Sequence, residues 1–376
     1  LINDQNLVGA NELISKIFTL PNNNDELQPA WFWKGEIAYR QQRYNDAINA
    51  LNNYLQNPQT YGDVNPQDAY YSLGYAYLRT AAYGKALSAF QHVSAQPDNG
   101  SSDVEKDAYL READCYFMQK NYAQASKIYD DVINNNWPSA DYAYYQKAVI
   151  AGAYGRVSDK VALLQAFDQK YKNSSLSQEA NLQMANSYMA NENFAQAIAP
   201  LNNVVNSNDD ALKPEAYLNL GVAYFNMNNN DASLNSFQKL ISAYPNSEQS
   251  NEALDYVRNI FVNENQPDKY VAFMQQNGKN VSYSEQDSLT YFSAFRMYGN
   301  SDITGAQQGF QNYISKFPQG RNSIDANYYL GEIYNQQKDY ANAEKYYEAV
   351  AQQAPNQYAE KATLQAARIS YFQLKD

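Results

Sequence analysis

Small and hydrophobic residues recur along this chain at helical spacing. Within one block, small residues and aromatics stand three, four and seven positions apart, which places them on one face of a first helix. Ala followed four residues later by Phe, Leu or Tyr marks one face of a second helix. The pattern therefore predicts pairs of amphipathic helices, although Tyr and Val commonly favour strands.

The helical pairs repeat every 35 to 39 residues. Each block is centred on a small residue, with Arg in one block, followed closely by an aromatic. The centres are Gly35, Gly74, Ala113, Ala148, Ala185, Gly221, Arg258, Ala294, Gly331 and Ala367. Sixteen residues further on stands a large apolar residue: Leu51, Phe90, Tyr129, Leu164, Leu201, Phe237, Met274, Phe310 and Tyr347. Because each pair leaves an apolar face that only its neighbour covers, this period predicts stacked helical hairpins.

Helix ends carry their own signals. Acidic residues are expected to open many first helices, where the helix dipole favours them: Asp68, Asp107, Glu179, Glu215, Glu252 and Asp325. Proline cannot continue a helix interior, so several prolines mark the ends of second helices: Pro97, Pro138, Pro245, Pro318 and Pro355.

The spacing of Leu330-Gly331, Tyr334, Tyr340, Ala343, Tyr347 and Pro355 resembles the tetratricopeptide repeat, as does the block around Gly74. The resemblance implies an all-α fold, a right-handed superhelical solenoid of stacked antiparallel helix hairpins. Residues 1–376 would form a single solenoid of about nine full repeats plus partial terminal units. It also implies that the first helices line a concave wall.

The sequence segments that end second helices, such as 242–247 and Lys316-Phe317-Pro318, are similar to those of extracytoplasmic bacterial repeat proteins in envelope assembly. This likeness favours a bacterial periplasm or cell envelope over the cytoplasm. Residues 8–19 suggest a helix without a preceding partner, and the last unit stops in or just after its first helix. We therefore expect the chain to be an interior piece of a longer solenoid.

Some blocks depart from the pattern. Pro267 and Tyr270 stand where other blocks have Tyr and Ala, and Gly278 follows, so we expect a bend near residues 258–290. Asn230 and Ser233 should weaken the preceding hairpin in the same columns, and Lys160 replaces Ala in an earlier one. The alternative is tolerated drift, with Lys160 extending outward.

Composition narrows the classes of function. A net charge of −12 disfavours nucleic acid, whose binding depends on Lys and Arg. No stretch approaches the roughly 18 apolar residues of a membrane span. One Cys (Cys115) and one His (His92) cannot supply an internal disulfide or a His-rich zinc site. Cys115 is expected to be buried in a helix and His92 to lie on a helix surface.

The sequence predicts no catalytic residue, metal site or cofactor. Carboxylate pairs such as Asp130-Asp131 and Asp209-Asp210 fall at helix ends or turns, where capping explains them. A helical-barrel glycoside hydrolase would need longer, less regular hairpins with catalytic loops. Gly152 and Gly155 mark a helix end and turn, and no Walker-type Lys-Ser or Lys-Thr follows them.

The remaining prediction is a binding wall. The resemblance to the tetratricopeptide repeat implies that these side chains lie on it: Phe32, Tyr39, Arg40, Tyr71, Tyr75, Arg79, Phe117, Tyr145, Phe225, Tyr291, Phe295, Tyr298 and Tyr328. Aromatics and Arg anchor interfaces because they bury large areas. The alternative is that many of these rings simply pack between neighbouring helices. The leading interpretation is a non-catalytic scaffold that binds a protein or peptide segment, and the runner-up is a glycan-binding module whose tyrosines stack on sugar rings.

Overall fold

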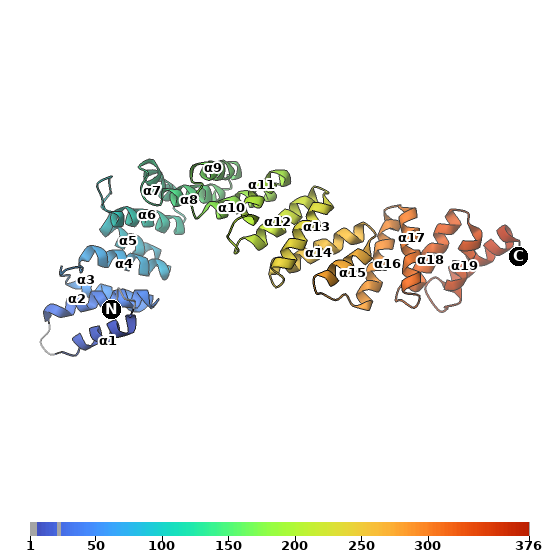
Figure 1. The fold of residues 1–376 in the computed structure, drawn as a ribbon, viewed down its shortest axis with the longest axis horizontal. Helices are drawn as coiled ribbons and strands as arrows, with labels where there is room; N and C mark the ends of the chain where they lie inside the picture. Colours follow the sequence, from blue (N-terminus) through green and yellow to red (C-terminus); the bar gives the residue numbers. More distant parts are fainter. Residues whose placement is uncertain (1–5, 21–23, 376) are drawn as a thin grey trace. The chain divides into compact units, whose positions relative to one another are not determined.

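The computed structural model describes residues 6–20 and 24–375. Within these ranges the chain forms twenty α-helices and one short π-helix (Figure 1). The bounds are α1 Leu7–Ile17, α2 Asn24–Arg40, α3 Tyr44–Gln56, α4 Pro66–Arg79, α5 Tyr83–Ser94, α6 Asp103–Met118, α7 Tyr122–Asn134, α8 Ala140–Ala153, α9 Val157–Lys170, α10 Ser177–Ala190, α11 Phe194–Val205, α12 Lys213–Asn226, α13 Asn230–Ala243, α14 Glu248–Asn263, α15 Pro267–Gln276, α16 Tyr283–Gly299, α17 Ile303–Lys316, α18 Ser323–Gln336, α19 Tyr340–Ala351, α20 Ala359–Ile369 and η1 Ser370–Leu374.

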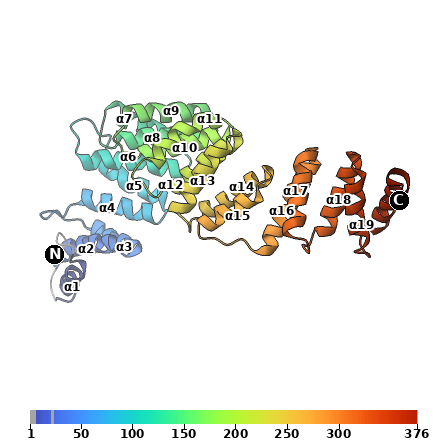
Figure 2. The same cartoon turned by 45° about the vertical axis from the view of Figure 1, so that its right-hand side comes forward.

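The chain divides into two compact units, Leu1–Ser187 and Tyr188–Asp376. Within each unit, helices that follow one another in the sequence pack as antiparallel pairs, and each pair packs on the next (Figures 1 and 2). This arrangement confirms the all-α repeat of helical hairpins. A single continuous solenoid over residues 1–376 stays a prediction.

Each hairpin turn uses one residue in the left-handed backbone region, seven positions after the block centre. The residues at this position are Gln42, Ala81, Lys120, Gly155, Glu192, Asn228, Asn265, Ser301 and Lys338, with φ between 54° and 71°. The next backbone N–H then donates to a carbonyl of the last helical turn, as from Ala82 to Tyr77 at 2.8 Å. This is a helix C-cap in which the left-handed residue follows the helix end. Backbone hydrogen bonds thus set the turn, and Gly155 confirms the predicted helix end there.

Opposite substitutions at two equivalent turn positions test the cost of the left-handed backbone. Left-handed backbone costs a residue with a side chain about 1–2 kcal/mol relative to Gly. We therefore expect Gly155→Ala to lower the free energy of unfolding by about 1 kcal/mol, and Ala81→Gly to raise it by a similar or smaller amount because Gly loses more chain entropy. Urea denaturation of both variants measures this. Changes of the same sign in both would contradict the turn geometry.

The small residue at a block centre packs against the large side chain that stands sixteen positions later in the sequence. A Cβ added to Gly35, Gly74 or Gly331 would lie 2.6 to 2.8 Å from the side chain of Leu51, Phe90 or Tyr347 respectively. Gly221 sits even closer to Phe237. All four large side chains are fully buried. The absence of a Cβ therefore lets the two helices of a hairpin approach, and the predicted register is confirmed.

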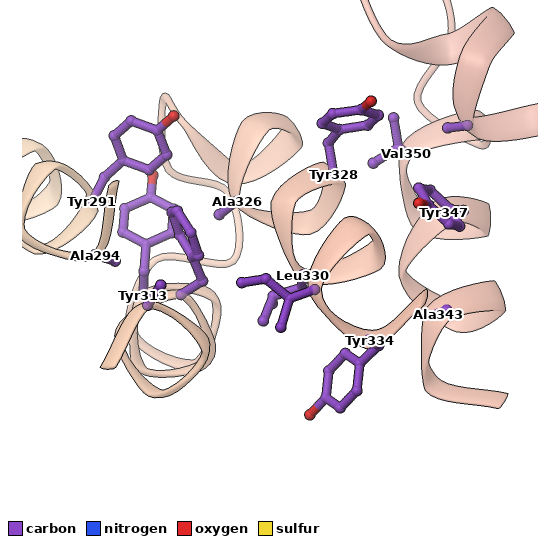
Figure 3. Packing of buried hydrophobic residues seen from close by; sticks show 14 of the residues in the cluster. Tyr291, Ala294, Tyr313, Ala326, Tyr328, Leu330, Tyr334, Ala343, Tyr347 and Val350 are labelled. Atoms are coloured by element: carbon purple, nitrogen blue, oxygen red, sulfur yellow. The ribbon is translucent and has the colours of Figure 1, made fainter. Parts of the chain in front are cut away.

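The second unit shows the same packing within two of its hairpins (Figure 3). Tyr328 of α18 lies over Tyr347 of α19, with ring centroids 6.2 Å apart. On the other side of Ala326, Tyr291 of α16 meets Tyr313 of α17 at 5.6 Å. Small residues bring the helix axes together, and rings fill the space beside them.

The expected weakening of the hairpin at Ser233 stays a prediction, although the side chain is well accommodated. Its side chain is fully buried, and its hydroxyl donates to the Gly221 carbonyl at 2.8 Å. A small residue is still required there, and the hydrogen bond satisfies the one polar atom it adds. Lys160 lies half-buried against Gly152 with its ammonium 2.9 Å from Gln183 Oε1, instead of extending freely outward.

Two acidic residues do not open helices as expected. α6 begins at Asp103 and α14 at Glu248, one turn earlier than Asp107 and Glu252 would indicate. In α6 a capping box between Ser102 and Glu105 fixes the start. Asp107 is thereby freed for contacts with a neighbouring helix.

The irregular block around Arg258 contains a short helix of ten residues, α15. Pro267 opens it at a position where proline is tolerated, and Tyr270 is buried in the core beneath. α14 and α15 share a smaller contact than the pairs α12–α13, α16–α17 and α18–α19. The change of curvature over residues 258–290 stays a prediction.

Candidate functional site

Two tyrosines of the predicted wall converge on one carboxylate in the first unit. Tyr71 and Tyr75 of α4 donate hydrogen bonds to Asp107 Oδ2 of α6, at 2.7 and 2.5 Å. Their rings meet edge to face at 5.1 Å, and Tyr75 packs on Phe90 at 5.3 Å. Both side chains are half-buried, and their hydrogen bonds join two successive first helices.

Arg111 continues this arrangement along α6. Its guanidinium donates to Asp107 Oδ1 at 3.2 Å and to Asp114 Oδ2 at 2.5 Å. Asp114 also accepts hydrogen bonds from Tyr129 of α7 at 2.7 Å and Tyr142 of α8 at 3.0 Å. We call the whole set the tyrosine–carboxylate network: Tyr71, Tyr75, Asp107, Arg111, Asp114, Tyr129 and Tyr142.

Burial governs the protonation of the network. Desolvation, strengthened by the bond to Asp107, raises the pKa of Tyr71 to about 12 and raises that of Tyr75 further. These hydroxyls therefore stay protonated donors at neutral pH. Burial also raises the pKa of Asp114, which Arg111 and the hydroxyls of Tyr129 and Tyr142 oppose. The groups satisfy one another, as expected of a structural polar network.

Other predicted wall residues of the first unit pack on rings of their own hairpins. The pairs and their centroid distances are Phe32–Tyr54 (5.6 Å), Tyr39–Tyr44 (5.6 Å) and Phe117–Tyr122 (5.4 Å). Tyr145 lies against Phe167, with its hydroxyl 3.4 Å from Glu179. Arg40 and Arg79 are exposed at the last residues of α2 and α4. In this unit the structure brings Tyr71 and Tyr75 together and gives the other rings separate packing partners.

Glu36 of α2 provides a pH-dependent contact next to the network. Burial raises the pKa of its carboxyl, while a hydrogen bond from Ser72 of α4 and the charge of Arg40 oppose the rise. A raised pKa in the folded state means that folding takes up protons. The stability from this group is present in full below its ordinary pKa of 4.5 and is lost as pH rises through the folded value.

We therefore expect Glu36→Gln to make the unfolding free energy less dependent on pH above 4.5. Glutamine keeps the shape but cannot ionise. The measurement is urea denaturation at several pH values, with the exposed Glu348→Gln as control. Parallel pH profiles for wild type and Glu36→Gln would show that Glu36 titrates normally.

The second unit gathers four predicted wall residues into one aromatic cluster. Tyr291 and Phe295 of α16 stack with centroids 5.9 Å apart, and Phe295 and Tyr298 lie 5.4 and 5.0 Å from Tyr329 of α18. Tyr328 touches the same Tyr329 ring at 5.8 Å. We call Tyr291, Phe295, Tyr298, Tyr328 and Tyr329 the aromatic wall. It spans two successive first helices, and Tyr329 joins its members.

Part of the aromatic wall is open to solvent. Phe295 is 39% exposed, and Phe292, one turn before it on α16, is 55% exposed. Charged groups border the rings, because Lys361 of α20 lies 5.0 Å from the Tyr328 centroid and 3.9 Å from Glu332. Accessible rings with charged groups beside them are typical of interface anchors. Phe225 lies elsewhere in this unit, 5.4 Å from Tyr256.

The prediction from the sequence did not include several residues of these sites. Arg111, Tyr256 and Tyr329 all stand two residues before a block centre, a position that was not assigned to the wall. Asp107 and Asp114 were also missed. The available signal was the spacing of Asp107, Arg111 and Asp114, which places three charges on one face of α6. A charged stripe usually marks a solvated helix face, so the spacing alone does not reveal burial.

The residues that the structure describes include no cluster of three or more His, Cys, Asp or Glu side chains that could hold a metal ion. In the same part of the chain no helix is both long and apolar enough to cross a membrane. Cys115 is buried, which raises its thiol pKa to about 12. His92 is on a helix surface, stacked on Tyr70 at 4.2 Å. Both placements confirm the sequence predictions.

The fold and these surfaces define a helical-hairpin repeat protein with side chains suited to binding. Family models described as tetratricopeptide repeat match residues 107–138 and 215–247, and residues 34–101 and 298–358. Together these segments cover about half of the sequence. The chain belongs to the tetratricopeptide repeat family.

Solved structures of repeat proteins are similar at low identity. The C-terminal part of a repeat protein from Cytophaga hutchinsonii is 12% identical with a TM-score of 0.48, over 78% of this chain and 98% of that one. A tetratricopeptide repeat protein from Parabacteroides merdae is 12% identical with a TM-score of 0.42, over 82% and 99%. YrrB, described as having an unusual peptide-binding site, is 15% identical with a TM-score of 0.38, over 55% and 98%. No curated protein matched the sequence.

Proposed function

We propose that the protein is a non-catalytic scaffold that holds an extended or helical segment of a partner protein against the aromatic wall of its second unit. The observation that carries this proposal is the contact of Phe295, Tyr298 and Tyr328 with one ring, Tyr329, while Phe295 stays accessible. Membership of a family of interaction repeats supports the class of function. The similarity of second-helix endings to envelope-assembly proteins favours a bacterial cell envelope as its location.

The chemistry of the aromatic wall indicates the kind of segment it would bind. Phe295 is exposed and Tyr298 and Tyr329 are partly exposed, whereas Tyr291 and Tyr328 are buried beside them. The accessible rings lie on two neighbouring first helices, which suits large apolar side chains spaced along one face of a peptide. Lys361 and Glu332 at the border can pair with charges of either sign at the edge of such a segment. A partner with apolar anchors flanked by charges fits this surface best.

The test begins with a random peptide library selected for binding to the full chain. We expect Phe295→Ala together with Tyr298→Ala to weaken an enriched peptide by about 2 kcal/mol, or roughly 30-fold in Kd, by calorimetry. The melting temperature should change little, because both side chains are partly exposed.

Tyr283→Ala is the matched control, since Tyr283 lies on the same helix and is 65% exposed. Its peptide affinity should equal that of wild type. An equal loss from Tyr283→Ala and from the wall variant would contradict the proposed site, as would a failure to enrich any peptide.

A further inference from the structure

A polar hollow of about 650 Å³ lies in the first unit, on the opposite face of α6 from the tyrosine–carboxylate network. Its floor is Tyr109, Glu112 and Tyr116, which follow one another at helical spacing on α6. Residues of the second helices α5 and α7 also line it, together with Trp137. The volume falls within the roughly 300–1,000 Å³ of small-molecule sites.

Glu112 is the unusual residue of this hollow. It is only 6% exposed and accepts a hydrogen bond from Ser94 of α5. Five other blocks have a buried apolar residue at the same repeat position: Leu73, Met184, Leu220, Val257 and Leu330. Hairpin packing therefore does not need a carboxylate here, and burying one lowers stability unless a partner compensates.

The second unit contains a smaller hollow at the equivalent repeat position, without counterparts of the carboxylates Glu112 and Asp131. Its hollow is about 260 Å³ and is framed by Tyr217 and Tyr224, the repeat equivalents of Tyr109 and Tyr116. There Leu220 replaces Glu112, and Val205 replaces Ser94. Lys239 replaces Asp131, whose carboxylate accepts from the Tyr109 hydroxyl at 2.9 Å. The repeat architecture thus makes a small groove, and particular residues of the first unit have enlarged it and made it polar.

The lining combines three kinds of group. Glu112 and Asp131 accept hydrogen bonds, whereas Lys127 and the amides of Gln91 and Gln124 can donate them. Tyr109, Tyr116 and Trp137 contribute rings. A simple cation would leave the donors without partners, and a simple anion would be repelled by the two carboxylates. A ligand with apolar C–H faces and hydroxyls that both donate and accept satisfies all three.

The geometry points to a binding site for a short neutral saccharide in this hollow, separate from the aromatic wall of the second unit. One face of a sugar ring would pack on Tyr116, and its hydroxyls would donate to Glu112 and Asp131 and accept from Lys127 and Gln124. Burial raises the pKa of Glu112, opposed by hydrogen bonds from Ser94 and Gln91.

Trp137 supplies a direct reporter for the test. The other two tryptophans, Trp31 and Trp33, lie on α2 and can be replaced by Phe so that only Trp137 emits. In this background of the full chain, cellotriose, maltotriose, mannotriose and N-acetylated chitotriose are titrated in turn, with spermidine as the cationic probe. At least one trisaccharide should change the emission saturably, and spermidine should not.

Ser94→Val with Glu112→Leu copies the apolar pair of the second unit. This variant should keep or raise the melting temperature while saccharide affinity falls at least about tenfold, the cost of losing one good hydrogen bond in a site. Tyr116→Ala should also weaken binding, and the equivalent Tyr224→Ala should not. No response to any of the four trisaccharides, binding of spermidine alone, or unchanged affinity in the apolar-pair variant would overturn the assignment.

Discussion

Asp114→Ala is expected to lower the free energy of unfolding by about 3–5 kcal/mol, the usual cost of removing one partner from a buried charge cluster. Arg111 would lose its 2.5 Å partner, and Tyr129 and Tyr142 would lose the acceptor of their hydroxyls. Side-chain exposure is only 19% for Arg111 and 14% for Asp114, so water replaces these bonds poorly. Chemical denaturation followed by circular dichroism measures the change.

Arg43 and Asp46 provide a matched control for this prediction. They form the same i,i+3 ion pair at 2.7 Å, but their side chains are 46% and 56% exposed. Asp46→Ala should therefore cost no more than about 1 kcal/mol. Replacing Arg111 with Met and Asp114 with Leu together should cost less than Asp114→Ala, because the one charge left, Asp107, keeps its hydrogen bonds from Tyr71 and Tyr75. Equal losses from Asp114→Ala and Asp46→Ala would show that the network is solvated.

Phe237→Ala should lower the free energy of unfolding by a comparable amount, about 3–5 kcal/mol. Phe237 is fully buried against Gly221, and its ring stacks on Tyr256 at 5.5 Å. Its removal leaves a cavity between α12 and α13 that the fixed helices cannot fill.

The contact between Phe237 and Gly221 also predicts partial rescue. Gly221→Leu alone should destabilise by about 1–3 kcal/mol through overpacking. In the double variant Gly221→Leu with Phe237→Ala, the new side chain occupies the space of the lost ring, so the total cost should fall well below the sum of the two. Gly84→Ala is the control, because a Cβ there meets nothing within 4 Å and should stabilise α5 slightly. Additive losses in the double variant would contradict the register.

The sequence was sufficient to predict the hairpins because their packing depends on a few periodic columns. Gly74 and Phe90, or Gly331 and Tyr347, contact each other in the structure at the predicted offset. Burial of apolar side chains is the main force that stabilises such packing. The spacing of the apolar residues can therefore be recognised in the sequence even where the polar residues between them differ from block to block. The burial of Ser233 could not be predicted from the apolar pattern, because a hydroxyl can be buried when a local carbonyl accepts its hydrogen bond.

Polar sites were harder to predict, since they depend on residues from several helices and have no period. Asp107 looked like a helix-opening residue, yet it accepts from Tyr71 and Tyr75 of another hairpin. Glu112 resembles any exposed helical glutamate until the structure shows it buried beside Ser94. The wall prediction identified Phe295 and Tyr298 but missed Tyr329, whose ring connects them.

Photo-crosslinking an enriched peptide to the full chain tests most directly whether first helices of the second unit bind a partner segment. A benzophenone on the peptide would react with nearby residues, which mass spectrometry then identifies. We expect crosslinks within α16 and α18, around Phe295 and Tyr329, and their loss when Phe295 and Tyr298 are replaced by Ala. Crosslinks confined to the second helices α17 and α19 would contradict binding at the aromatic wall.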